Sequence, residues 1–193
     1  MSELAPGDVQ TFTRGRLLAT DQVVQDMLKA ALAVARNYTG WPVSPVITGA
    51  VITLDGPGGR DLFLPTRKIT AVESVVEDGV TLDPADYVLS ANTPGMLHRK
   101  NGRWTTAYAG ITVTIDHGYT EVEAADWRRA VMLMVDQMSR AQQVGARSAE
   151  DLVRKKVDDV ELQWADYGSM AERTLHSVQS ILDSYALPPT GFA

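Results

Sequence analysis

Residues 36–45, which read RNYTGWPVSP, decide the fold of this chain because one kind of structure ends there and another begins. Before them, apolar side chains recur every three or four residues, which is the period of one helix face. Gly40 permits a left-handed helix cap, and Pro42 cannot continue the helical hydrogen-bond ladder. We therefore predict a helix of about 18 residues that begins at Thr20 or Asp21 and ends at this junction.

After the junction, from Pro45 to Tyr119, the apolar period changes to two, with turn-forming residues every several positions. Residues 55–59, DGPGG, predict a hairpin turn between a strand ending near residue 54 and a second strand at residues 62–64. The Asp-Gly pair at residues 78–79 is the sharpest short hairpin signal in the chain. We predict an antiparallel β-rich insertion at residues 46–119.

Two capping signals of the form Ser/Thr-x-x-Glu, at residues 120–123 and 169–172, predict two further helices. The first helix is expected to run to about Gly145, and the polar residues 146–167 are expected to form an extended arm before the second. The predicted fold class is α+β, with a helical core of three main helices, an inserted antiparallel β-rich region and the arm. We expect residues 1–193 to form a single domain.

The amino-acid composition excludes or disfavours several classes of function. The 193 residues carry 18 basic and 24 acidic side chains, a net charge of −6, and 45% are hydrophobic, as in ordinary globular proteins. This acidic balance disfavours sequence-specific DNA binding. The lack of a long apolar run or a signal-peptide pattern predicts cytoplasmic synthesis and no membrane association. With no cysteine, disulfides and thiolate chemistry are excluded, and no cofactor or metal is expected.

Asp116 and His117 are the strongest candidates for catalysis, because they follow a strand, where α/β enzymes often keep reactive groups. A small hydrolase that uses this pair is one alternative function. A catalytic serine, however, needs a histidine base and a tight elbow, and no Gly-x-Ser-x-Gly occurs. We expect a turn at this strand end and no enzyme activity. We interpret His98 and His176 as interface or surface residues and not as metal ligands.

The predicted arm contains a compact basic run followed by a short alternating apolar pattern. A single strand cannot satisfy its own backbone, so this segment needs a sheet edge, either in the insertion or in a neighbouring subunit. A DNA-binding packaging module built on the basic run is an alternative that the acidic chain disfavours. Six residues are candidate inter-subunit contacts: Arg154, Lys155, Lys156, Val160, Leu162 and Trp164.

The C-terminal tail, residues 187–193, reads LPPTGFA. Two adjacent prolines stiffen it, and an aromatic side chain lies next to its end. A preformed tail with an apolar tip suits docking into a partner at low entropic cost. The candidate partner-binding residues are Leu187, Pro188, Pro189 and Phe192.

These patterns together resemble the head-to-tail adaptor (head-tail connector) proteins of long-tailed bacteriophages, those of phages infecting actinobacteria in particular. The chain departs from that pattern at Tyr38, where Cys is commoner, and at Pro42, where a polar residue is usual. The most specific matching pieces are GWPVSP at 40–45, LFLPT at 62–66, VESVVEDG at 72–79 and ITVTIDHGY at 111–119.

The resemblance implies a structural virion protein without catalytic residues, located at the neck and made in the bacterial host cytoplasm. Such proteins form a dodecameric ring between portal and stopper or tail and continue the DNA channel. DNA would pass through without sequence-specific binding, which an acidic lumen favours. In this family the C-terminal segment often embraces the portal, so Leu187, Pro188, Pro189 and Phe192 would bind it. A stopper or tail-completion protein is the alternative within this class.

Overall fold

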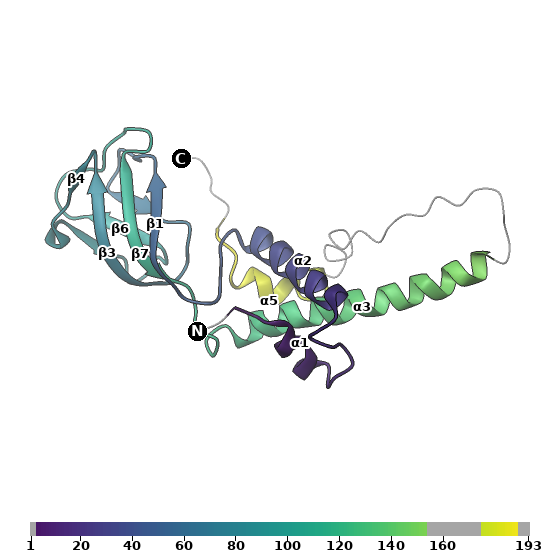
Figure 1. The fold of residues 1–193 in the computed structure, drawn as a ribbon. Coiled ribbons are helices and arrows are strands. Elements are labelled where there is room, and N and C mark those ends of the chain that lie inside the picture. The colour runs from purple at the N-terminus through teal and green to yellow at the C-terminus, as the bar shows by residue number, and fades with distance from the viewer. Residues whose placement is uncertain (1–2, 154–174, 189–193) are drawn as a thin grey trace. The chain divides into compact units, whose positions relative to one another are not determined.

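The computed structural model describes residues 3–153 and 175–188, and for residues 141–153 it describes the backbone alone. The chain divides into two compact units (Figure 1). The described part of the helical unit is residues 3–39, 125–153 and 175–186, and that of the β unit is residues 40–124 with Leu187 and Pro188. The predicted α+β fold class is confirmed.

The helical unit contains four helices in its described part: α1 (Pro6–Phe12), α2 (Gln22–Thr39), α3 (Ala125–Val153) and α5 (Gln179–Asp183). The prediction for α2 is confirmed. The Asp21 carboxylate accepts a hydrogen bond from the backbone N–H of Val23 at 2.9 Å, which satisfies one of the free amides at the helix start. Gly40 ends the helix with φ of +81°.

The core of this unit lies where α2, α3 and α5 pack together. Tyr185, just after α5, donates a hydrogen bond to Asp126 of α3, and Tyr38 of α2 donates one to Asp183 of α5. Both bonds fix the short α5 against the longer helices. The buried apolar side chains of α2 are Val24, Met27, Leu28, Ala31, Leu32 and Ala35; those of α3 are Trp127, Ala130, Val131, Met134, Val135 and Met138; and those near α5 are Val178, Leu182 and Tyr185.

The helices differ from the prediction in three respects. Helix α3 continues past Gly145 to Val153, because the following residues, ARSAEDLV, hold no breaker and an isolated glycine costs only about 1 kcal/mol inside a helix. Residues 146–153 are therefore helical and not part of an extended arm. The last helix is interrupted by a turn at residues 176–178, which leaves α5 only five residues long. Helix α1 was not predicted.

The β unit consists of two antiparallel sheets. The four-stranded sheet has the order β1 (Ile47–Leu54), β7 (Ile111–His117), β3 (Ile69–Glu77) and β4 (Val80–Thr81). The three-stranded sheet has the order β2 (Asp61–Phe63), β6 (Met96–Arg99) and β5 (Tyr87–Leu89), and a short 3-10 turn, η1 (Pro84–Asp86), precedes β5. The predicted β-rich character of this region is confirmed.

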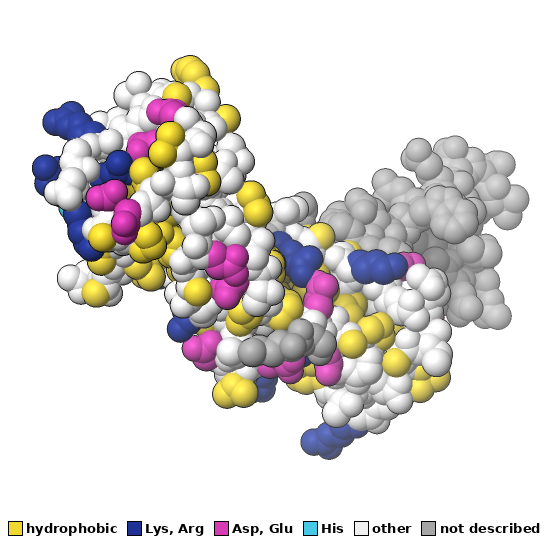
Figure 2. Space-filling model, turned by 60° about the vertical axis from the view of Figure 1, so that its left-hand side comes forward, with side chains coloured by type: hydrophobic (Ala, Val, Ile, Leu, Met, Phe, Trp, Pro, Cys, Tyr) yellow, Lys and Arg dark blue, Asp and Glu magenta, His cyan; other side chains and the backbone are white. Residues whose placement is uncertain are grey.

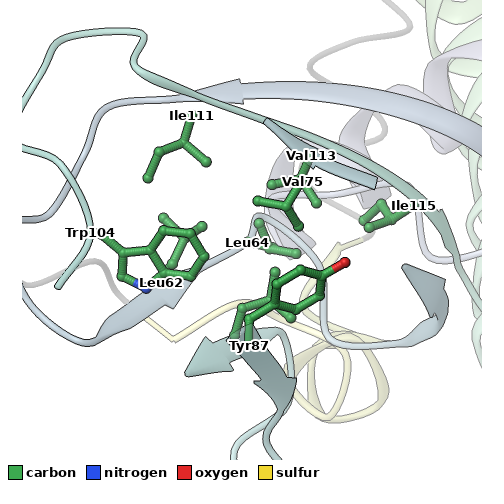
Figure 3. Packing of buried hydrophobic residues seen from close by; sticks show 9 residues of the cluster. Leu62, Leu64, Val75, Tyr87, Trp104, Ile111, Val113 and Ile115 are labelled. Atoms are coloured by element: carbon green, nitrogen blue, oxygen red, sulfur yellow. The ribbon is translucent and has the colours of Figure 1, made fainter. Parts of the chain in front are cut away.

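One hydrophobic cluster joins the two sheets (Figure 3). Along β7 every second residue is buried, as expected for a strand with one face on a core. Trp104 caps the cluster from a loop, and its indole N–H donates to the backbone carbonyl of Arg60 at 2.8 Å. The cluster contains Leu62, Leu64, Val75, Tyr87, Leu97, Trp104, Ile111, Val113 and Ile115.

The two predicted hairpins have different outcomes. The Asp78-Gly79 hairpin is confirmed: β3 pairs with β4, and both turn residues have positive φ, +49° and +80°. The hairpin across residues 55–59 is wrong, because β1 pairs with β7 and β2 pairs with β6. The glycine-rich segment instead carries the chain from one sheet to the other.

Candidate assembly surfaces

The structure places Asp116 and His117 on different faces of the sheet, which does not support the hydrolase interpretation. Neighbouring residues of a strand point to opposite faces of the sheet, and these two follow that rule at the end of β7. The Asp116 carboxylate accepts a hydrogen bond from the backbone N–H of Gly49 at 2.8 Å, while His117 is buried with only 5% of its surface exposed. The two side chains therefore face opposite sides of the sheet.

His117 serves the packing of the β unit. Its Nδ1 lies 3.2 Å from the Thr66 hydroxyl, and its ring stacks on Trp41, with 6.3 Å between ring centroids. Trp41 also contacts Tyr119, at 5.8 Å between centroids. Burial lowers the pKa of His117, and the nearby Asp116 charge opposes that shift. The motif GWPVSP is thus tied to the end of β7 by its tryptophan.

The other two histidines have half-exposed or exposed side chains, as expected. His98 lies beside Asp61 across the β2–β6 pair, and His176 lies beside Gln179. Among the described residues, no group of three or more His, Asp or Glu side chains is placed to hold a metal ion.

Two adjacent loops of the β unit are joined by backbone hydrogen bonds. We call this pair the loop ribbon: residues 55–60 and residues 100–110. Gly56 donates its N–H to Ala107 at 2.9 Å and Gly58 donates to Thr105 at 3.0 Å, so the two loops run side by side. A Cβ on Gly56 would lie 2.0 Å from the Thr105 carbonyl oxygen, which explains why this position needs glycine.

A charged pair holds the base of the loop ribbon. Glu77, at the end of β3, accepts the backbone N–H of Thr105 at 2.7 Å and forms an ion pair with Arg99 at 2.8 Å. Only 12% and 15% of the Glu77 and Arg99 side chains are exposed, so solvent screens this pair less than a surface pair. The Arg99 guanidinium also lies over the Trp104 ring, 5.2 Å from its centroid.

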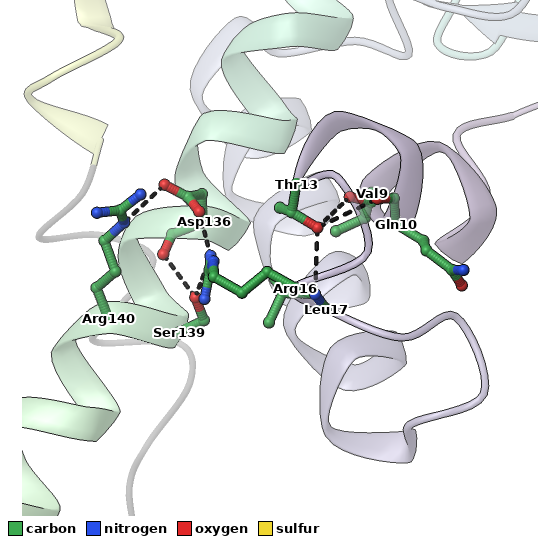
Figure 4. A network of polar contacts seen from close by, with 8 residues as sticks. All are labelled: Val9, Gln10, Thr13, Arg16, Leu17, Asp136, Ser139 and Arg140. Carbon is green, nitrogen blue, oxygen red and sulfur yellow. Dashed lines mark hydrogen bonds and ion pairs between the residues drawn. The ribbon is translucent and has the colours of Figure 1, made fainter.

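In the helical unit, a polar network fixes the segment after α1 to α3 (Figure 4). The Arg16 guanidinium pairs with Asp136 and donates to the Ser139 hydroxyl at 3.0 Å. Asp136 also binds Arg140, one helical turn on, at 2.9 Å. At the base of this segment, Thr13 donates its hydroxyl to the Val9 carbonyl at 2.8 Å and accepts the Leu17 N–H at 3.2 Å.

The predicted contact residues are only partly within the described chain. Leu187 lies against Gly40, where a Cβ would come within 3.3 Å of the Leu187 Cδ1, and Pro188 is exposed. The remaining candidates lie outside the described residues: Arg154, Lys155, Lys156, Val160, Leu162, Trp164, Pro189 and Phe192. Their proposed contacts stay predictions.

The loop ribbon and α1 were not predicted from the sequence. The loop ribbon has no periodic pattern, and its two halves meet only because distant strands pair. For α1 a signal existed: Pro6 at the first helical position and Asp8 three residues after Ala5, whose N–H the Asp8 carboxylate accepts at 2.8 Å. In the described part of the chain, no helix combines the length and apolar character needed to cross a bilayer.

The helical unit and two-sheet β unit match chains from assembled particles along nearly their full length. One is from the neck of a native gene transfer agent (GTA) particle computed with C12 symmetry, at 12% identity and a TM-score of 0.56, covering 100% of this chain and 96% of that one.

A second is from the neck of an empty GTA particle computed with C6 symmetry, at 14% identity and a TM-score of 0.58, covering 98% and 92%. The virion of the native particle gives a third match, at 14% identity and a TM-score of 0.56. No curated protein matches the chain. The family model of the head completion proteins matches residues 7–149. This chain belongs to the head completion protein family, which confirms the resemblance to phage connector proteins.

Proposed function

We propose that this protein forms a ring at the virion neck, between the portal and the stopper or tail, and continues the DNA channel there. Membership of the head completion family carries the proposal. The likeness of the whole fold to chains in necks with C12 and C6 symmetry supports a ring of identical subunits. A ring needs two different faces on each subunit, which meet head to tail.

The same observations support a structural role without catalysis. Asp116 and His117 point away from each other, and each is engaged by its own neighbours. Within the class, a stopper or tail-completion protein is the second candidate. The four described helices disfavour it, because those proteins are expected to be mainly β.

Loss of the protein from a phage that encodes it provides the test. If the ring joins head to tail, particles made without the protein will be DNA-filled heads and free tails, and the full chain supplied in trans will restore tailed particles. Electron microscopy of the two preparations gives the readout. Normal numbers of tailed particles without the protein would contradict the proposal.

Two predicted surfaces belong to this proposal. The tail, with Leu187, Pro188, Pro189 and Phe192, would bind the portal, and residues 154–164 of the arm would bind the neighbouring subunit. Removal of residues 189–193 retains the Leu187 contact with Gly40, so we expect an intact fold and weaker portal binding. Pull-down with purified portal measures the effect, and equal binding by the shortened chain would remove this part of the proposal.

The lumen of the proposed ring is expected to be lined mainly by acidic side chains. The net charge of −6 would repel DNA phosphates and keep the passing duplex from sticking. A map of the intact neck that shows a lumen crowded with Arg and Lys would count against this expectation.

A further inference from the structure

The tip of the loop ribbon presents an aromatic side chain to solvent. Tyr108 is 91% exposed, the highest exposure of any large hydrophobic or aromatic residue in the described chain. Exposed tyrosines that stand on a rigid support are frequent anchors in protein interfaces, because they bury much area with little loss of side-chain freedom.

The backbone around Tyr108 is held by hydrogen bonds. Ala109 donates its N–H to Asp55 at 2.7 Å, and the Gly110 carbonyl accepts the Asp78 N–H at 2.8 Å. The Ala107 carbonyl accepts N–H groups from both Gly56, at 2.9 Å, and Gly110, at 3.2 Å. The tip is therefore ordered before any partner arrives, which lowers the entropic cost of binding.

The backbone of Ala109 is a second feature that points to a binding role for this loop. Its φ is +51°, in the left-handed region that costs a residue with a Cβ roughly 1–2 kcal/mol. Strained positions of this kind persist where the surrounding structure fixes them, and they cluster at binding sites. Here the strain turns the chain immediately after Tyr108.

Three exposed cations lie on the same loop ribbon: Arg60, Lys100 and Arg103. The Arg60 carbonyl accepts the N–H of Arg99 and the indole N–H of Trp104, each at 2.8 Å, and this brings residues 60, 100 and 103 together. None of the three forms an ion pair within the described part of the chain, unlike Lys68 and Arg99. Figure 2 shows Lys and Arg side chains gathered on one side of the β unit.

This basic cluster stands out against an acidic background. Residues 40–124 contain six basic and ten acidic side chains, a net charge of −4. Three cations on a unit of that charge are too few to hold duplex DNA, whose binding depends on many phosphate contacts. They suit an acidic protein surface, and a second copy of this chain, with its net charge of −6, provides one.

We propose that the loop ribbon is the face through which one copy binds the next, with Tyr108 as the anchor and Arg60, Lys100 and Arg103 paired with carboxylates of the neighbour. The inference rests on the proposed ring and deepens it. A basic patch that pairs with carboxylates elsewhere on the next copy is a head-to-tail contact, which is the kind that a ring requires.

Photo-crosslinking in assembled necks tests the proposal. p-Benzoylphenylalanine replaces Tyr108 in the full chain, necks are isolated and irradiated, and the products are separated by mass. We expect a covalent dimer of twice the 21.0 kDa chain. Val122, which is 85% exposed and lies outside the loop ribbon, is the matched position, and we expect at least tenfold less dimer from it.

Three outcomes would overturn the inference: a crosslink from position 108 to a different neck protein, a crosslink to DNA, or a dimer yield no higher than that of position 122. None of these outcomes by itself contradicts the proposed ring at the neck. Mass spectrometry of the same necks shows whether the chain is present in many copies, so a failed loop contact is distinguished from a failed ring.

Charge reversal gives a second test. The triple variant R60E/K100E/R103E should lower the amount of chain incorporated into necks at least tenfold, and Lys29→Glu, an exposed cation on α2, should not. All four side chains are exposed, so circular dichroism should show the wild-type fold in both variants. Wild-type incorporation of a folded triple variant would overturn the inference.

Discussion

At the scale of single residues, glycines mark where the β unit permits no side chain. Gly95, in the turn before β6, has φ of +73°, and a Cβ there would lie 2.0 Å from the Thr66 carbonyl oxygen. We predict that Gly95→Ala lowers the free energy of unfolding by about 3 kcal/mol, because left-handed strain adds to a backbone clash. Urea unfolding measures the change.

Gly102→Ala is the matched control for that prediction. Gly102 has a similar φ, +79°, but nothing lies within 4 Å of its Cβ position. Only the cost of the left-handed backbone remains, about 1 kcal/mol. Equal losses for the two variants would show that the close approach to Thr66 is not what constrains Gly95.

His117 makes the stability of the β unit depend on pH. Burial lowers its pKa in the folded protein, so on acidification the unfolded chain takes up the proton first. The free energy of unfolding should therefore fall as the pH drops below about 6.5, by up to about 1.4 kcal/mol per pH unit, and level off below the folded pKa.

His117→Gln should remove this part of the pH profile, and His176→Gln, which replaces an exposed histidine, should retain it. Urea unfolding of the three proteins between pH 5 and pH 8 provides the comparison. A wild-type slope that persists in His117→Gln would assign the pH dependence to other groups.

The residues that could be predicted were those whose role is local. Gly40 and the Asp78-Gly79 pair act through their own backbone angles, and the sequence shows such angles directly. Gly56 was assigned to a hairpin, because its actual constraint is a carbonyl about 50 residues away. No sequence pattern marks Tyr108, because its proposed role rests on its exposure and on the hydrogen bonds of its loop.

At the scale of elements, α1 is held to the helical unit by its own core residue and by the polar network after it. Val9 is fully buried, and Arg16 pairs with Asp136 of α3. We predict that Asp136→Asn lowers the free energy of unfolding by about 1 kcal/mol, since the pair is partly solvated. Faster amide exchange in residues 6–17 would accompany the loss.

Asp26→Asn is the control for this element. Asp26 pairs with Lys29 on the surface of α2, with 43% and 72% of the side chains exposed, and such pairs contribute little. Its effect should stay within about 0.5 kcal/mol. A loss of unfolding free energy as large as that of Asp136→Asn would mean that the α1–α3 network stabilises the protein no more than a surface ion pair does.

Elements in which the apolar periodicity continues over many residues could be predicted from the sequence. The elements that they pair or pack with could not. Helix α2 follows from its periodicity and its two caps. The pairing of β1 with β7 joins residues that lie more than 50 positions apart, and a local turn signal cannot reveal it. Helix α1 was missed because a seven-residue helix with one buried side chain has almost no period to detect.

At the scale of the whole molecule, the division into two units has a testable consequence. Residues 40–124 are continuous in sequence and enclose the cluster shown in Figure 3. We predict that this fragment folds alone, because it has its own core and about 85 residues are enough for a domain. Circular dichroism should show β structure that unfolds cooperatively, and a disordered fragment would contradict this prediction.

At this scale, the class of the protein could be predicted from its sequence. The motif GWPVSP and the strand patterns indicated a phage connector, and the family match confirmed that class. The surfaces that would build a ring could not be read from the sequence. The proposed contact depends on which loops the strand pairing brings together, because Arg60 and Arg103 lie on different loops of the loop ribbon.

The central claim is that copies of this chain assemble into a ring on the portal. Native mass measurement of the purified chain, alone and mixed with purified portal, tests it most directly. We predict that the portal gains a mass equal to a whole number of 21.0 kDa chains, twelve by resemblance to the family, in a single dominant species. A portal mass that does not change, or that rises by one chain only, would contradict the account.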